Sequence, residues 1–153
     1  MKVKECMTPS PVTCAPGTSL RLVAQLMADL DCSAIPVSDS GVLAGIITDR
    51  DIACRAVTTA DDAPNRPASE FMTVPVIAVA PEDSEEHAIE LMQTNHLHHL
   101  PVVDAEGQIV GIIAQSDLGR RMTNREFGTL ARNLSVKHPF VDYGRVDALI
   151  KSH

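Results

Sequence analysis

The segment Gly45-Ile46-Ile47-Thr48-Asp49-Arg50-Asp51 carries the most specific chemistry in the chain. An aliphatic run ends in the hydroxyl of Thr48, and the carboxylate of Asp51 follows three residues later. If a strand ends and a helix begins here, both side chains lie on one side of the corner. The carboxylate can then accept hydrogen bonds from two vicinal hydroxyls such as those of ribose, and free N–H groups at the helix start favour anions. The same spacing also suits an ordinary helix start, with Thr48 as the cap.

A second candidate group is the histidine cluster His96, His98 and His99, which precedes Leu100-Pro101. Imidazoles can donate hydrogen bonds to a phosphate, and two or three of them can also bind a transition metal such as zinc. Neighbouring residues of a strand point to opposite faces, so His98 and His99 do not easily face one ion. We therefore predict phosphate contact or surface exposure and no metal site, with zinc binding as the alternative.

These two groups belong to different halves of an internal duplication. Glu5-Cys6-Met7-Thr8 opens the first copy and Glu70-Phe71-Met72-Thr73 opens the second, 65 residues later. At the Gly-Ile-Ile element the offset becomes 66 residues. Two copies of one unit usually form a pseudo-twofold pair with two related sites in the crevice between them.

The elements that position these residues follow the same order in both copies. Thr18 or Ser19 caps the first long helix, and a capping box of Asp83 with Glu86 begins the corresponding helix of the second copy. The pattern predicts strands over 12–14, 35–37, 43–48, 100–103 and 109–114, and helices up to Leu30, over 49–57, up to Thr94 and from near Ser116.

The repeat also divides the chain. We predict a first unit over 1–57, a linker rich in Asp, Ala and Pro over 58–67, and a second unit over 68–122. The remaining extension, 123–153, carries spaced apolar residues and is expected to be partly helical, packing on the pair or on a partner subunit.

Composition limits the classes of partner. The net charge of −7 argues against bulk nucleic-acid binding, which needs a basic face. No apolar run approaches membrane-spanning length and no N-terminal signal region is present, so we expect a cytoplasmic protein without a membrane partner.

The whole repeat resembles the cystathionine β-synthase (CBS) domain over about residues 3–122. The resemblance rests on the Met-Thr openings, Pro and Ser before a helix, Ile35-Pro36-Val37 and Leu100-Pro101-Val102 with a following Asp, and Gly-Ile-Ile-Thr-x-x-Asp. It implies an α/β (α+β) fold of two β-α-β-β-α units, packed as a pseudo-twofold pair often called a Bateman module. Such pairs commonly form homodimers and bind AMP, ADP, ATP, NAD or S-adenosylmethionine between the copies.

Position by position, the resemblance makes Thr48 and Asp51 the ribose-binding pair of the first copy. In the second copy Asp117 matches the carboxylate but Ala114 replaces the hydroxyl, so a weaker site with Asp117 and Ser116 is expected. The remaining assignments are phosphate contacts from His98, His99 and Arg50, with Arg55 as a further candidate, and an adenine pocket of Val12, Ile35 and Pro36.

No motif in the chain indicates catalysis: there is no nucleophile elbow, no P-loop and no dinucleotide-binding Gly-x-Gly-x-x-Gly. The main hypothesis is a stand-alone regulatory protein, not an enzyme, that senses an adenine nucleotide and signals to an unknown partner protein. The alternatives are a constitutive dimeric interaction module with decayed ligand sites and, less favoured, a small metal-binding stress protein using the histidine cluster.

Overall fold

The structure, a computed structural model, describes residues 1–135. In the first copy Ser19, one of the two predicted caps, begins helix α1 (Leu20–Leu30). Its hydroxyl accepts a hydrogen bond from the backbone N–H of Leu22. Strands β2 (Ala34–Asp39) and β3 (Val42–Thr48) pair antiparallel. A continuous helical stretch follows, made of α2 (Asp49–Asp51), a π-helical turn (Ile52–Ala56) and α3 (Val57–Thr59).

The second copy repeats this order with α4 (Glu85–Asn95), β4 (His99–Val103), β5 (Ile109–Ala114) and α5 (Gln115–Gly119). The predicted capping box is wrong in detail. Ser84 is the N-cap of α4 and accepts from the N–H of His87, while the carboxylate of Asp83 accepts from the N–H of Ala80 in the preceding turn. Both acidic and hydroxyl side chains cap well, and the chain places Ser84 one residue closer to the helix.

The strand predicted over 12–14 is reduced to a single parallel bridge between Cys14 and Val37. The second copy has the matching bridge between Val79 and Val102. Each of these bridges places a buried side chain beside the central hairpin of its own copy.

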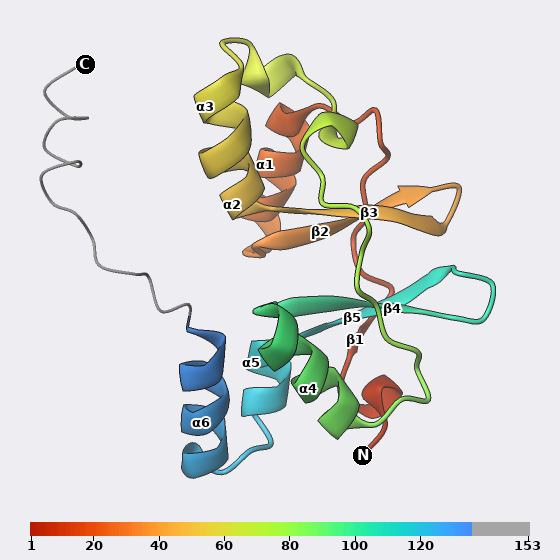
Figure 1. The fold of residues 1–153 in the computed structure, drawn as a ribbon. Coiled ribbons are helices and arrows are strands. Elements are labelled where there is room, and N and C mark those ends of the chain that lie inside the picture. Colours follow the sequence, from red (N-terminus) through yellow and green to blue (C-terminus); the bar gives the residue numbers. More distant parts are fainter. Residues whose placement is uncertain (136–153) are drawn as a thin grey trace, which may run out of the picture.

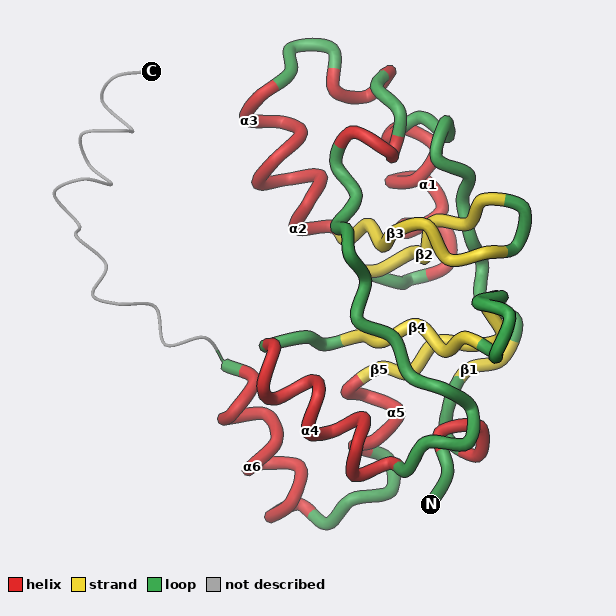
Figure 2. Tube along the Cα trace, turned by 45° about the vertical axis from the view of Figure 1, so that its right-hand side comes forward, coloured by secondary structure: helices red, strands yellow, loops and turns green. Residues whose placement is uncertain are grey.

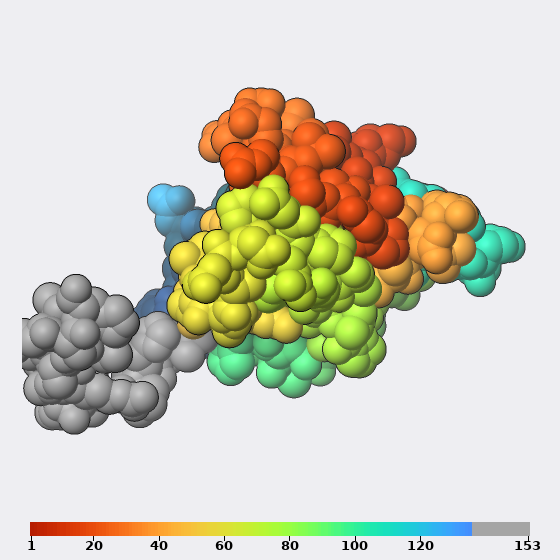
Figure 3. All heavy atoms as spheres, turned by 90° about the horizontal axis from the view of Figure 1, so that it is seen from above, coloured from red at the N-terminus to blue at the C-terminus, as the bar shows by residue number. Residues whose placement is uncertain are grey.

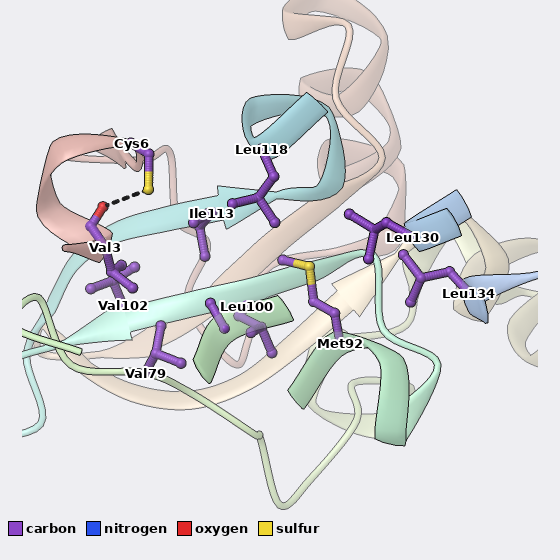
Figure 4. Packing of buried hydrophobic residues seen from close by; sticks show 11 residues of the cluster. Val3, Cys6, Val79, Met92, Leu100, Val102, Ile113, Leu118, Leu130 and Leu134 are labelled. Carbon is purple, nitrogen blue, oxygen red and sulfur yellow. Dashed lines mark hydrogen bonds between the residues drawn. The ribbon is translucent and has the colours of Figure 1, made fainter. Parts of the chain in front are cut away.

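The opening segment of each copy packs in the core of the other. A 3₁₀ turn (Val3–Glu5) places Val3 and Cys6 among the buried residues of the second copy, as Figure 4 shows. Strand β1 (Thr8–Pro9) then pairs antiparallel with β5. Because of this exchange, the sequence repeats and the two packing clusters do not coincide. The unit boundaries at residues 57, 67 and 122 therefore stay a prediction.

The reciprocal exchange brings the second opening segment to the first copy. Ala68 and Phe71 are buried in the first core, and Thr73 bridges to Ile46 of β3. The Met72 side chain lies over Gly45, where an added Cβ would be only 2.5 Å from its sulfur. A side chain at position 45 would force the Met72 side chain to move, so glycine suits the close crossing of the exchanged segment over the strand.

The two sheets lie toward the middle of the molecule and the helices lie on its outer sides (Figures 1 and 2). Helices α1, α2 and α3 cover one end and α4, α5 and α6 cover the other. Each copy therefore has its own aliphatic core between sheet and helices. The two sheets face each other across the middle of the molecule (Figure 1).

The C-terminal extension begins with helix α6 (Asn124–Leu134), which packs on α4 and buries Leu130 and Leu134 in the second core. On the first copy, the linker supplies only a short 3₁₀ turn (Ala63–Asn65) against α1. Figure 3 looks onto this outer face, where α1 lies beside the α2–α3 region and the linker. The rest of the predicted extension, 136–153, lies outside the described residues. Among the helices of residues 1–135, none is long and apolar enough to cross a membrane.

Candidate functional site

The corner between β3 and α2 holds Thr48 and Asp51 in a reciprocal arrangement. The Thr48 hydroxyl accepts from the N–H of Asp51 at 3.2 Å and donates to Asp51 Oδ2 at 2.9 Å. The backbone N–H of Thr48 donates to the same Oδ2 at 2.9 Å. The two side chains predicted to read a diol thus already orient one another, and they also cap the helix start.

Among the described residues, Asp51 is the one charged residue that is buried, with 8% of its surface exposed. A buried carboxylate needs hydrogen-bond partners or a counter-charge. Besides Thr48, it has Arg55, whose Nη1 donates to Asp51 Oδ1 at 3.2 Å and to the carbonyl of Phe71 at 2.9 Å. The sequence indicates Arg55 only as a phosphate candidate, whereas in the structure it is a hydrogen-bond partner of the carboxylate.

A cleft of about 530 Å³, here called the first cleft, opens beside this corner. Residues from both copies line it. It brings together all five predicted ribose and phosphate residues: Thr48, Arg50, Asp51, His98 and His99. Its other lining residues come from both copies and include Thr73, Pro75, Val76, Ile77 and Pro101 of the second copy.

The two histidines at the cleft differ in environment. His98 is exposed, and its Nδ1 lies 2.8 Å from Oε1 of Gln115. His99 is half-buried, with Nε2 3.4 Å from the Ser33 hydroxyl. Burial lowers the pKa of His99, and the neighbouring His98 lowers it further, whereas the carboxylates of Asp49 and Asp117 act in the opposite direction.

No group of three or more metal-binding side chains occurs within residues 1–135. His96 lies at the left-handed C-cap of α4 and also lines the first cleft. All three histidines of the cluster therefore lie along the wall of the first cleft.

A second cleft of about 610 Å³ occupies the pseudo-twofold related position. Asp117 and Ser116 line it, as does Arg120, which replaces Cys54 of the first copy. Asp117 Oδ2 accepts from the backbone N–H of Ala114 at 2.9 Å, which reproduces the Thr48 N–H contact without the hydroxyl. Ser116 is exposed, and within residues 1–135 it makes no hydrogen bond to Asp117.

The predicted adenine pocket does not form at the first cleft. Val12 and Pro36 line the second cleft, and Ile35 is only 1% exposed in the first core and lines neither. The reason is the exchange of opening segments, which sends residues after β1 to the other copy's corner. Strand alternation also turns Ile35 and Pro36 to opposite faces.

The residues that replace them follow from the repeat offset. Ile77 and Pro101 are the 65-residue counterparts of Val12 and Pro36, and both line the first cleft. Pairing the first copy's Asp51 with the second copy's apolar counterparts could have found them from sequence. His99 and Ser33 line both clefts, so the two sites share one wall.

The CBS domain family model matches residues 3–56 and 68–124 of the chain. The chain belongs to the CBS-domain family. The predicted fold, two CBS repeats mixing helix and sheet, is thereby confirmed. A CBS domain-containing protein of Bacillus subtilis, YhcV, is 37% identical over 134 residues, which is 87% of this chain and 94% of YhcV.

Inosine-5'-monophosphate dehydrogenase of Mycobacterium leprae is 38% identical over 112 residues, 72% of this chain but 20% of that enzyme. The match to this enzyme is therefore confined to a fifth of its length.

Two solved CBS structures carry adenosyl ligands. The CBS domain pair of protein MJ0100, in complex with 5'-methylthioadenosine and S-adenosyl-L-methionine, is 27% identical with a TM-score of 0.71, covering 78% of this chain and 94% of that one. CBSX2 in complex with AMP is 25% identical with a TM-score of 0.68, covering 78% and 93%. CBS pairs similar to this chain thus bind adenosyl ligands.

Proposed function

We propose that this CBS pair binds an adenosyl ligand (AMP, ADP, ATP, NAD or S-adenosylmethionine) in the first cleft and regulates a partner protein. The observation that carries the proposal is the buried carboxylate of Asp51 at the cleft wall, oriented by Thr48 and Arg55. A carboxylate fixed in this way accepts ribose hydroxyls without first having to be ordered.

The rest of the ligand would contact the other residues that line the first cleft. His98, His99 and Arg50 supply donors for phosphate oxygens. Val76, Ile77 and Pro101 offer apolar surface for the adenine ring, in place of the pocket predicted from sequence.

Regulation would follow because residues of both copies line the first cleft. The ribose side belongs to the first copy, whereas His98 and His99 belong to the second, so a ligand that contacts both favours one relative placement of the copies. A ligand shifts such an equilibrium only by its difference in affinity between the two states. Exposed Leu22 and Val57 on α1 and α3 offer a helical face for homodimerisation or for the regulated partner.

The test is a titration of the full chain with AMP, ATP, NAD and S-adenosylmethionine while the thermal midpoint is followed. A ligand that binds the folded state raises the midpoint in proportion to the logarithm of its concentration. Flat midpoints for all four at millimolar concentration would contradict the proposal and leave its two alternatives, the constitutive interaction module and the metal-binding protein. A response to zinc alone would favour the metal-binding alternative.

The site is tested by Asp51→Ala, with Asp117→Ala as the matched control. If Asp51 accepts the ribose hydroxyls, its loss costs roughly 1.5–3 kcal/mol, about 10- to 150-fold in affinity by calorimetry. Asp117→Ala should change affinity much less, since Ala114 removes the hydroxyl there. Equal losses from both variants would contradict the assignment to the first cleft.

A further inference from the structure

Arg55 links the cleft carboxylate to the exchanged segment. Its Nη1 donates both to Asp51 Oδ1 and to the carbonyl of Phe71, although the side chain is 50% exposed. Asp51 precedes Arg55 by one helical turn, the spacing at which side chains face each other. The guanidinium is thus held between two acceptors, one of which is the carboxylate that lines the first cleft.

The hydrogen bonds of Asp51 leave a defined number of its acceptor positions free. A carboxylate offers about four, two on each oxygen. Oδ2 takes the backbone N–H and the hydroxyl of Thr48, and Oδ1 takes Arg55. The backbone N–H and the guanidinium are fixed, one on each oxygen, whereas the Thr48 hydroxyl can rotate away. One position then remains on each oxygen of the same carboxylate, which is the number that two vicinal hydroxyls require.

We propose that Arg55 is a specificity-determining residue that sets Asp51 to read a vicinal diol. By occupying one position on Oδ1, it fixes the plane of the carboxylate and leaves one acceptor on each oxygen. Without Arg55, Oδ1 gains a second free position and the group can turn to accept a single hydroxyl. The inference rests on the proposed function, because it concerns how the same cleft distinguishes ribose from 2'-deoxyribose.

The second copy supplies a matched control. Arg121 is the counterpart of Arg55, but helix α5 ends at Gly119 with Arg120 as its C-cap. Arg121 therefore lies beyond the helix, and its Nη1 contacts Met1 Sδ at 3.0 Å. Arg121→Met removes the same side chain without touching the first cleft.

The experiment measures the affinities of AMP and 2'-deoxy-AMP by calorimetry for the full chain and for Arg55→Met and Arg121→Met. The unchanged chain should prefer AMP by about tenfold or more, because an unfilled acceptor is costly in a buried site. Arg55→Met should weaken AMP about tenfold and 2'-deoxy-AMP much less, so that the preference largely disappears. Arg121→Met should keep it.

The ratio separates specificity from other effects. A lost positive charge weakens both phosphates alike, and partial unfolding affects both ligands in the same sample, so neither changes the ratio. An unaltered ratio in Arg55→Met, or an unchanged chain that does not distinguish the two nucleotides, would overturn the inference while leaving the proposed function intact. Absence of AMP binding to the unchanged chain would instead count against the proposed function, and the inference would fall with it.

Discussion

In the first copy, Asp51 accepts three protein hydrogen bonds, two from Thr48 and one from Arg55; in the second, Asp117 accepts one, from the N–H of Ala114, among the described residues. The bond from the backbone N–H is 2.9 Å long in both copies. This backbone hydrogen bond alone is therefore enough to explain why the helix start of each copy carries a carboxylate. The hydroxyl and the guanidinium distinguish the first cleft, and the ligand hypothesis depends on them.

The outer faces of the two copies differ as well. Helix α6 covers the second copy and buries Leu130 and Leu134, whereas a three-residue turn of the linker covers part of the first. A groove of about 330 Å³ remains open there between α1 and α3. The outer face of the second copy is thus more completely covered. The first copy is the one whose carboxylate has more hydrogen-bond partners at the strand-to-helix corner.

The largest expected effect tests how much helix α6 stabilises the second copy. Leu130→Ala should destabilise the protein by about 2–5 kcal/mol, because it leaves a cavity in the second core. Leu22→Ala, the same substitution at a side chain 51% exposed on α1, should change stability by no more than about 0.5 kcal/mol. Urea unfolding at constant pH measures both. Similar losses from the two would mean that α6 adds little to the second core.

A smaller effect tests whether the hydroxyl is the missing part of the second corner. Ala114→Thr should stabilise the start of α5 by about 0.5–2 kcal/mol, since α5 has no side-chain cap at present. It should also strengthen binding of AMP at the second cleft, raising the stoichiometry seen by calorimetry. Thr48→Ala is the converse change and should cost a similar amount. If Ala114→Thr stabilises the chain and AMP stoichiometry stays fixed, the hydroxyl alone does not make the site.

The sequence predicted the local elements well because each is encoded twice. Helix α1 begins after Ser19 as expected, and β5 has the predicted bounds. The capping of α4 was displaced because Asp83 and Ser84 are both good caps and only the backbone decides between them. These are short-range features, for which periodicity and capping chemistry are adequate evidence.

The exchange of opening segments could not be read from the pattern. A repeat shows which residues correspond, but not whether Val3 and Cys6 pack in their own copy or in the other. That choice decides whether Val12 or Ile77 borders the first cleft, and it places Val12 at the second cleft, away from Thr48 and Asp51. The second role of Arg55, its bond to Phe71, depends on the same exchange.

The smallest expected effect is the pH dependence at the wall that both clefts share. Burial and the nearby His98 lower the pKa of His99 below its ordinary value of 6.5, and Asp49 and Asp117 only partly offset this. The unfolded chain therefore binds the proton first as pH falls through about 6.5. Stability contributed by neutral His99 is complete above that pH and is lost below it.

Affinity should move in the opposite direction. If His99 meets a phosphate, the protonated imidazole is the better partner, so AMP should bind more tightly as pH falls from 8 toward 6 while the free protein becomes less stable. His99→Gln should remove both trends, and His87→Gln, an exposed position on α4, should remove neither. Because the phosphate of AMP itself titrates near pH 6, the measured quantity is the difference between the unchanged chain and His99→Gln at each pH. If that difference is constant across the range, His99 is a wall residue of the first cleft without phosphate contact, and the phosphate donors are His98 and Arg50 alone.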